Sequence, residues 1–183
     1  MTERHGWFKF NRYVGEGYKR LLFADLVETS FQLRYLRAKR EVPTPWPNDI
    51  TFRLEGDGVE DVPYQVHGWF LVSERLKALV EGAELTGITF YPIRTESRLT
   101  VPAPRYWYGH LAIVDDAIDL NRSIYGPSEV LGKIFGRIFL KPEVAKDWDF
   151  LRTAESKASI FCSNRFRHLF LSNNCTGLGF IPA

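Results

Sequence analysis

Residues 71–92 read LVSERLKALVEGAELTGITFYP, and residues 161–182 read FCSNRFRHLFLSNNCTGLGFIP, an internal match at an offset of 90 positions. Aligned without a gap, seven of the 22 positions are identical, where average residue usage would give about one or two. The identical pairs are Ser73/Ser163, Arg75/Arg165, Leu79/Leu169, Thr86/Thr176, Gly87/Gly177, Phe90/Phe180 and Pro92/Pro182. We therefore interpret the two segments as copies of an internal repeat.

Each copy carries the signals of a strand, a helix and a second strand. A short apolar run precedes Ser73 or Ser163, whose hydroxyl can accept a hydrogen bond from a free backbone N–H and so begin a helix. Apolar side chains then recur at the i, i+3, i+4 spacing of a buried helix face. Gly82 is expected to end the first helix in a left-handed cap, and Asn173 or Asn174 the second. A Thr-Gly turn leads into the second strand, which ends at a proline.

One identical pair has no evident folding role. Arg75 and Arg165 fall in the first helical turn, where an arginine opposes the helix dipole. An arginine at such a position is usually held by a carboxylate elsewhere in the fold and less often contacts a ligand. We interpret the shared positions as structural, and these are Ser73, Arg75, Gly87, Ser163, Arg165 and Gly177.

The rest of the chain adds mainly strand signals. Aromatic or apolar runs predict strands at 6–13, 18–25, 105–114 and 133–141, and alternation of apolar and polar residues predicts another at 31–38. A short helix is expected within 142–152. The predicted fold class is α+β, a mixed sheet with few short helices.

This fold would contain the two related strand-helix-strand units at about 69–92 and 159–182. We expect a single domain over residues 1–183. Within it, residues 1–48 form an N-terminal strand-rich segment that ends in a proline-rich stretch, and residues 49–183 hold the repeat.

The composition is that of an ordinary globular protein. Of 183 residues, 45% are apolar and 25% charged, which argues against disorder. The formal net charge of +2 is too weak to indicate nucleic acid or an acidic membrane as the partner. No secretory signal and no apolar run near the roughly 20 residues that span a bilayer is present, so a cytoplasmic location is expected. The two cysteines, Cys162 and Cys175, lack CxxC spacing, and the sequence leaves open whether they pair.

Several segments together resemble a family of bacterial proteins. They are Val72-Ser-Glu-Arg-Leu76, Thr86-Gly-Ile-Thr-Phe90, Val114-Asp-Asp-Ala-Ile-Asp-Leu-Asn-Arg-Ser123, Ser163-Asn-Arg-Phe166 and Thr176-Gly-Leu-Gly-Phe180. This pattern is similar to the polymorphic-toxin immunity proteins of the eleventh immunity family, formerly a domain of unknown function. The resemblance covers roughly residues 50–182. It implies neutralisation of a cognate toxin domain by direct contact inside the producing cell, and it supplies no catalytic residues, metal or cofactor.

A toxin interface would draw most of its energy from aromatic and arginine anchors within a charged rim. The candidate toxin contacts are the anchors Trp46, Tyr106, Trp107 and Tyr108 and the rim residues Glu55, Asp57, Glu60 and Asp61. Because side chains alternate along a strand, Trp107 faces away from Tyr106 and Tyr108, so one of the two sets is core. The sequence does not say which. The acidic residues also fit an ordinary solvated loop, because glycines flanked by acids are typical of turns.

A hydrolase is the first alternative. It would need a nucleophile and a base brought together, and the nearest pairing is His168 with Cys175, seven residues apart. No HExxH, GxSxG or P-loop spacing occurs. Asp115, Asp116 and Asp119 could offer oxygen ligands to a divalent ion, but the segment lacks the glycine and final glutamate of a calcium loop, so we interpret it as a solvated turn.

A nucleic-acid-binding module is the second alternative. The basic stretch 34–40 contains an aromatic residue, a combination found on stacking platforms. The acidic middle of the chain opposes such binding, and we expect neither a nucleic-acid nor a membrane partner. The oligomeric state is not indicated.

Overall fold

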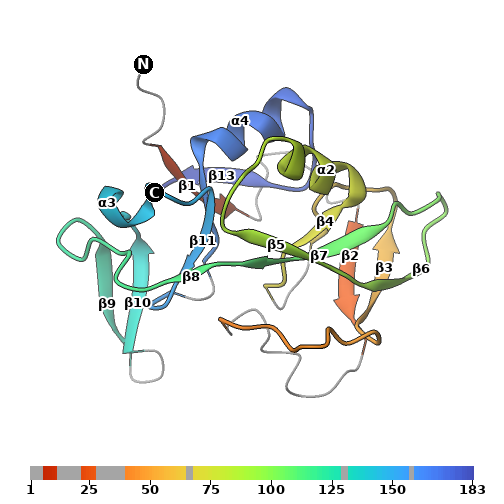
Figure 1. Ribbon diagram of the computed structural model, residues 1–183, viewed down its shortest axis with the longest axis horizontal. Coiled ribbons are helices and arrows are strands. Elements are labelled where there is room, and N and C mark those ends of the chain that lie inside the picture. The colour runs from red at the N-terminus through yellow and green to blue at the C-terminus, as the bar shows by residue number, and fades with distance from the viewer. Residues whose placement is uncertain (1–5, 12–21, 28–39, 65–67, 129–131, 157–158) are drawn as a thin grey trace.

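The computed structural model describes residues 6–11, 22–27, 40–64, 68–128, 132–156 and 159–183 (Figure 1). The strands are β1 (Trp7–Asn11), β2 (Leu22–Leu26), β3 (Thr51–Gly56), β4 (Leu71–Ser73), β5 (Ile88–Pro92), β6 (Arg94–Ser97), β7 (Tyr106–Leu111), β8 (Ile113–Val114), β9 (Ile124–Ser128), β10 (Gly132–Arg137), β11 (Phe150–Thr153), β12 (Phe161–Ser163) and β13 (Gly179–Pro182). The helices of the described residues are α2 (Glu74–Gly82), α3 (Pro142–Ala145) and α4 (Asn164–Ser172). The α+β class with few short helices is confirmed.

Both repeat segments form a strand, a helix and a second strand: β4-α2-β5 in the first and β12-α4-β13 in the second. Each helix begins at the predicted serine. The Ser73 hydroxyl accepts a hydrogen bond from the Leu76 backbone N–H at 3.2 Å, and the Ser163 hydroxyl accepts one from Phe166 at 3.4 Å. The first helix ends later than predicted. It runs through Gly82, and the left-handed residue is Glu84 (φ 51°), the counterpart of Asn174 (φ 51°).

A third strand completes each segment, and the two third strands come from different places in the sequence. Strand β7 lies between β4 and β5 and is antiparallel to both. Strand β1, from the N-terminal segment, lies in the same way between β12 and β13. The registers match, because Trp107 pairs with Val72 and Phe8 with its counterpart Cys162. The N-terminal segment is thus built into the second repeat.

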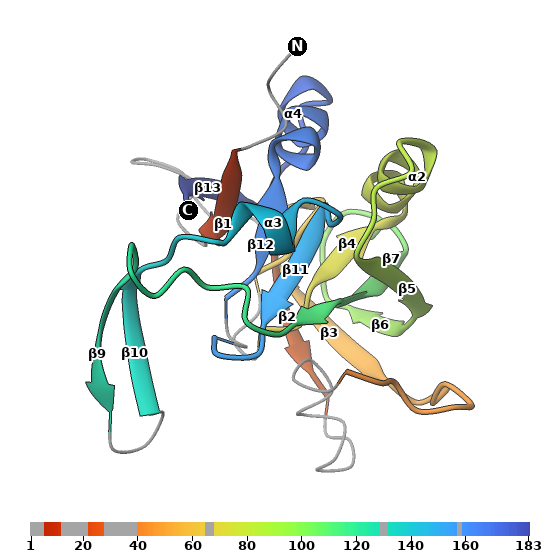
Figure 2. The ribbon, with the colours of Figure 1, turned by 60° about the vertical axis from the view of Figure 1, so that its left-hand side comes forward.

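Further strands extend the sheet of the second segment or form separate sheets. Strands β11 and β8 extend the sheet of the second segment to the order β13-β1-β12-β11-β8, and β2-β3-β6 form a sheet of their own. Strands β9 and β10 pair with each other only, among the described residues, and project from the body of the molecule (Figure 2).

The central core lies between the helices and the sheets, and both repeats contribute to it. Helix α2 supplies Leu76 and Val80, helix α4 supplies Phe166 and Phe170, and Phe150 of β11 packs among them. The two helices contact each other and cover the same side of the molecule (Figures 1 and 2). Two smaller cores lie beneath the remaining sheets, one around Phe52, Trp69 and Tyr108 and the other around Trp7, Ile138 and Phe161.

The structure shortens one predicted element and does not describe another. The predicted helix within 142–152 is only α3, because residues 150 and 151 pair with β12 as strand β11. The predicted strand at 31–38 lies outside the described residues.

Candidate functional site

A buried aspartate holds the start of helix α2. The Ser73 hydroxyl donates to Asp61 Oδ1 at 2.7 Å, and Arg75 donates from Nε at 3.2 Å and from Nη2 at 2.9 Å. The Thr176 backbone N–H donates to Asp61 Oδ2 at 3.0 Å, while the Asp61 N–H donates back to Thr176 Oγ1 at 3.2 Å. We call these four residues the Asp61 clasp. Burial alone would raise the pKa of the Asp61 carboxyl, but these hydrogen bonds outweigh it and hold the pKa below its ordinary value of 3.8.

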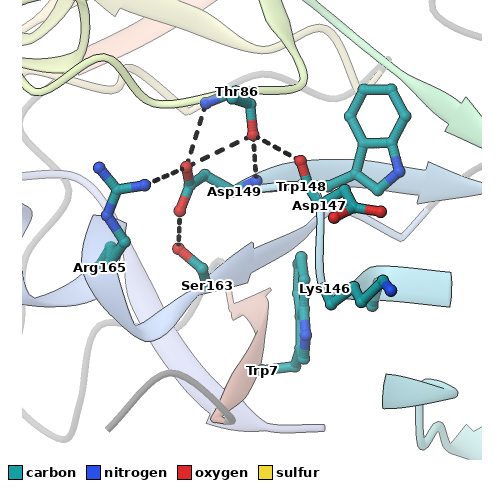
Figure 3. A pocket seen from close by; sticks show the side chains of 9 residues that line it. Trp7, Thr86, Lys146, Asp147, Trp148, Asp149, Ser163 and Arg165 are labelled. Atoms are coloured by element: carbon teal, nitrogen blue, oxygen red, sulfur yellow. Dashed lines mark hydrogen bonds and ion pairs between the residues drawn. The ribbon is translucent and has the colours of Figure 1, made fainter. Parts of the chain in front are cut away.

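A second buried aspartate holds helix α4 in the same manner (Figure 3). Asp149 accepts from the Ser163 hydroxyl at 2.6 Å and from Arg165 Nη1 at 2.9 Å. The Thr86 backbone N–H donates to Asp149 Oδ2 at 3.1 Å, and the Asp149 N–H donates to Thr86 Oγ1 at 3.1 Å. We call these four residues the Asp149 clasp. Each first-turn arginine therefore has a carboxylate partner from outside its own helix.

The two clasps exchange their threonines. Thr176 of the second repeat closes the clasp of the first, and Thr86 of the first repeat closes the clasp of the second. The glycine after each threonine is required by close packing. A Cβ on Gly177 would lie 2.1 Å from the Val62 carbonyl oxygen, and one on Gly87 would lie 2.0 Å from that of Phe150. Both glycines also have positive φ, 102° and 84°, which disfavours other residues. These shared residues fasten one repeat to the other.

Of the three candidate aromatic contacts on β7, only Trp107 lies at the surface. Tyr106 and Tyr108 are 0% and 1% exposed, so the prediction that they contact a partner is wrong. The half-buried indole of Trp107 packs against the Lys77 ammonium, 4.7 Å from the ring centroid, and the Arg105 guanidinium, 4.3 Å away. Its Nε1 donates to a carboxylate oxygen of Glu74. The surface around Trp107 thus combines an aromatic ring with two cations.

Of the four acidic candidate rim residues, two are buried and two lie at the surface. Glu60 and Asp61 are 2% and 8% exposed. Both are buried and therefore do not form part of a charged rim at the surface. Asp61 is instead the centre of a clasp. Asp57 is exposed, and Glu55 on β3 is half-exposed and pairs with Arg98 at 2.9 Å.

Trp46 is half-buried and anchors the proline-rich stretch against the body of the protein. Its ring stacks on Tyr91 with 4.5 Å between centroids, and its Nε1 donates to the Pro92 carbonyl at 2.7 Å. Part of the ring remains open to solvent. Trp46 therefore has a structural role that leaves only a limited area for a partner.

A cavity of about 150 Å³ adjoins the Asp149 clasp (Figure 3). Its remaining lining includes Trp7, Trp148, Lys146 and Asp147. The Asp149 carboxylate already accepts hydrogen bonds from three residues. It is therefore occupied in holding the fold rather than placed to transfer a proton.

Residues 19–183 match the Immunity protein family (Imm11). The chain belongs to this family. No curated protein is significantly similar to it. The Imm11 match is wider than the resemblance seen in the sequence, since it begins ahead of β2 and includes the proline-rich stretch. Strand β1, which completes the second repeat, precedes the matched residues.

The thiol chemistry of this Imm11 member does not favour the hydrolase alternative. His168 lies exposed on α4, whereas Cys175 is 9% exposed in the central core. Burial raises the pKa of the Cys175 thiol, which is opposite to the shift that activates a nucleophile. The described hydrogen bonds include none between the two side chains. Cys162 is fully buried, its pKa is also raised by burial, and both cysteines are free.

The other chemical candidates are also engaged in structural contacts. Asp115 pairs with Arg40, Asp116 pairs with Lys141 at 2.7 Å, and Asp119 accepts from the backbone N–H of Asn121 at 3.0 Å. Within the described ranges, no three His, Cys, Asp or Glu residues lie close enough together to hold a metal ion. Of the basic stretch 34–40, only Arg40 lies within the described residues. Among the described residues of the whole chain, no helix has the length and apolar character to cross a bilayer.

Proposed function

We propose that this chain neutralises a cognate bacterial toxin domain by binding it directly in the cytoplasm of the producing cell, without catalysing a reaction. The observation that carries the proposal is the Imm11 match over residues 19–183. An immunity protein of this family implies a toxin as its partner, and a polymorphic-toxin domain is the partner that the sequence resemblance indicates.

The arrangement of buried polar groups supports a binding role. The buried aspartates and serines, which could in principle serve catalysis, are used to hold the two repeats together. A framework fastened in this way loses little conformational freedom when a partner binds, which favours affinity. The predicted contacts that stay at the surface are Trp46, Glu55, Asp57 and Trp107.

The test is first to examine whether a neighbouring gene encodes a protein with a toxin domain, and then to co-express that domain with this chain. We expect the two proteins to purify together as a defined complex and the chain to protect cells from the toxin domain. A folded, purified chain that neither binds that domain nor protects cells would contradict the proposal.

Two variants test the surviving contacts. Trp107→Ala removes the one surface aromatic of β7, and Glu55→Lys with Asp57→Lys reverses the exposed acids without changing the buried pair. If either surface meets the toxin, its variant weakens the complex while the melting temperature stays near that of the wild type. Full protection by both folded variants would remove both surfaces from the interface.

A further inference from the structure

The hairpin of β9 and β10, which we call the exposed hairpin, presents apolar side chains on both of its faces. Ile124 is 66% exposed, the highest value for a large apolar side chain in the described ranges, and Tyr125 is 42% exposed. Neighbouring residues on a strand point to opposite faces. Both side chains therefore keep solvent-exposed area, Ile124 on one face and Tyr125 on the other. The Tyr125 ring lies 5.7 Å from that of Phe135, which packs against the core around Trp7, Ile138 and Phe161. Figure 2 shows the hairpin standing away from the body.

Two arginines flank the base of the exposed hairpin. Arg122 and Arg137 hold their guanidinium carbons 4.7 and 4.6 Å from the centroid of the Phe139 ring. Both arginines are exposed, and no carboxylate of the described residues forms an ion pair with either one. Stacking limits the motion of a guanidinium, so little entropy is lost when it binds.

These features match those of a protein interface more closely than those of a free surface. A two-stranded hairpin is only marginally stable by itself in water. Tyrosine and arginine are enriched among the residues that dominate binding energy. Arginine pairs best with carboxylates, through two parallel hydrogen bonds. A partner that covers this hairpin should thus be concave, to contact both faces, and acidic where it meets the base.

We propose that the exposed hairpin is the main docking element for the toxin, with Ile124 and Tyr125 inserted into a concave toxin surface and Arg122 and Arg137 paired with carboxylates at its rim. This inference rests on the proposed function, because the occupant is the cognate toxin domain. The hairpin lies within the residues that match the Imm11 family.

The surface around Trp107 offers less to a partner. The Trp107 ring already contacts Lys77 and Arg105, and its N–H is bonded to Glu74. In both views the exposed hairpin stands at the left edge, whereas β7 lies in the middle and right part of the molecule (Figures 1 and 2). The two surfaces share no residue, so mutations can test them separately.

The experiment measures the Kd and the association rate of the purified toxin domain for the unaltered chain, for Trp107→Ala and for three double variants. Ile124→Ser with Tyr125→Ser removes the apolar contacts, and Arg122→Gln with Arg137→Gln removes the charges. The matched control, Leu171→Ser with Ile181→Ser, removes two apolar side chains of similar exposure (48% and 46%) elsewhere on the surface. Circular dichroism and the melting temperature establish that each variant is folded.

We expect the apolar hairpin variant to weaken binding about 30-fold or more and the control to change it less than about threefold. The arginine variant should also reduce the dependence of the association rate on salt, because charges at the rim steer association. A folded apolar variant that binds as tightly as the wild type overturns the docking proposal. Loss of binding in Trp107→Ala alone would place the toxin on the other side. If the wild type itself does not bind the toxin domain, the proposed function fails and the docking proposal with it.

Discussion

The Asp61 clasp and the Asp149 clasp are built from the same residue types but differ in how tightly they are closed. Arg75 gives two nitrogens to Asp61, whereas Arg165 gives one to Asp149. Both arginines also reach a carbonyl of the other repeat through Nη2, Arg165 that of Ala83 at 3.0 Å and Arg75 that of its counterpart Asn173 at 3.4 Å. The strand residue paired with each serine also differs.

Tyr106 pairs with Ser73 and is fully buried, with its hydroxyl donating to the Glu60 carbonyl at 2.7 Å. Trp7 pairs with Ser163, is 9% exposed and borders the cavity of Figure 3. Identical residues in the two repeats thus produce the same local hydrogen bonds, and the segments outside the repeats decide how each site is covered.

The largest effect is expected at the two clasp glycines. Gly177→Ala and Gly87→Ala would each push a Cβ into a backbone carbonyl at about 2 Å, at a positive φ as well. Each should lower the free energy of unfolding by more than about 3 kcal/mol, measured by urea denaturation. Gly82→Ala is the control, because a Cβ there meets nothing within 4 Å. A loss below about 1 kcal/mol at either clasp would show that its turn can move away.

The next largest loss of stability is expected when the aspartate of either clasp is replaced. Asp61→Asn and Asp149→Asn each leave a buried site with an arginine and a serine that lose their carboxylate, at a cost of about 2–4 kcal/mol. Equal losses would show that the second arginine nitrogen at Asp61 adds little. A loss at only one clasp would contradict the view that both fasten the repeats.

The Asp61 clasp should also respond to pH. Its folded-state pKa lies below the ordinary 3.8, so the carboxylate stabilises the fold above pH 3.8, and this stabilisation is lost as the pH falls through the folded-state pKa. The difference in unfolding free energy between wild type and Asp61→Asn should be constant near neutral pH and shrink below pH 3.8. Urea titrations at several pH values measure it, and a difference that grows on acidification would contradict the assignment.

Replacing the clasp arginines should destabilise the fold less, and by different amounts at the two clasps. Arg75→Lys loses a two-nitrogen contact with Asp61, whereas Arg165→Lys loses one nitrogen contact with Asp149. Both side chains are about half-exposed, so solvent screening limits the losses to about 1 kcal/mol or less. Thermal denaturation should rank Arg75→Lys as the more destabilising. The reverse order would mean that the Arg165 bond to Ala83 is the stronger anchor.

The smallest effect is expected at Cys175. Its counterpart in the first repeat, 90 positions earlier, is Leu85, which also packs against the central core. Cys175→Leu should therefore change the free energy of unfolding by about 0.5 kcal/mol or less, even though it removes the 3.5 Å contact with Arg75 Nη2. A larger loss, in the same denaturation assay, would indicate that the thiol contact contributes to the Asp61 clasp.

Local signals in the sequence were sufficient to predict the two strand-helix-strand units. A capping serine, a helical spacing of apolar residues and a Thr-Gly turn all act within about 20 residues of each other. The aspartates could not be found in this way. Asp61 precedes its serine by 12 residues and Asp149 precedes its own by 14, so an alignment without gaps does not pair them. The one available signal was the need of each arginine for a carboxylate.

The exposed hairpin likewise could not be predicted as a docking element from the sequence. Its second strand was predicted from an apolar run, but the exposure of Ile124 and the stacking of Arg122 and Arg137 on Phe139 depend on which surfaces the rest of the chain covers. A sequence pattern does not contain that information.

The sequence by itself determined the start of the helix, the Thr-Gly turn and the end of the second strand in each repeat. These features depend on neighbouring residues and on hydrogen bonds within a few positions. The sequence also determined that Trp107 and its two neighbouring tyrosines face opposite sides of a strand. Only the tertiary structure decided which side is buried, because Tyr108 packs against Trp46 and Trp69, which lie far from it in the chain. It likewise decided that β1 completes the second repeat. Contacts between distant segments depend on how all the apolar faces are covered together, and no single stretch of sequence specifies that.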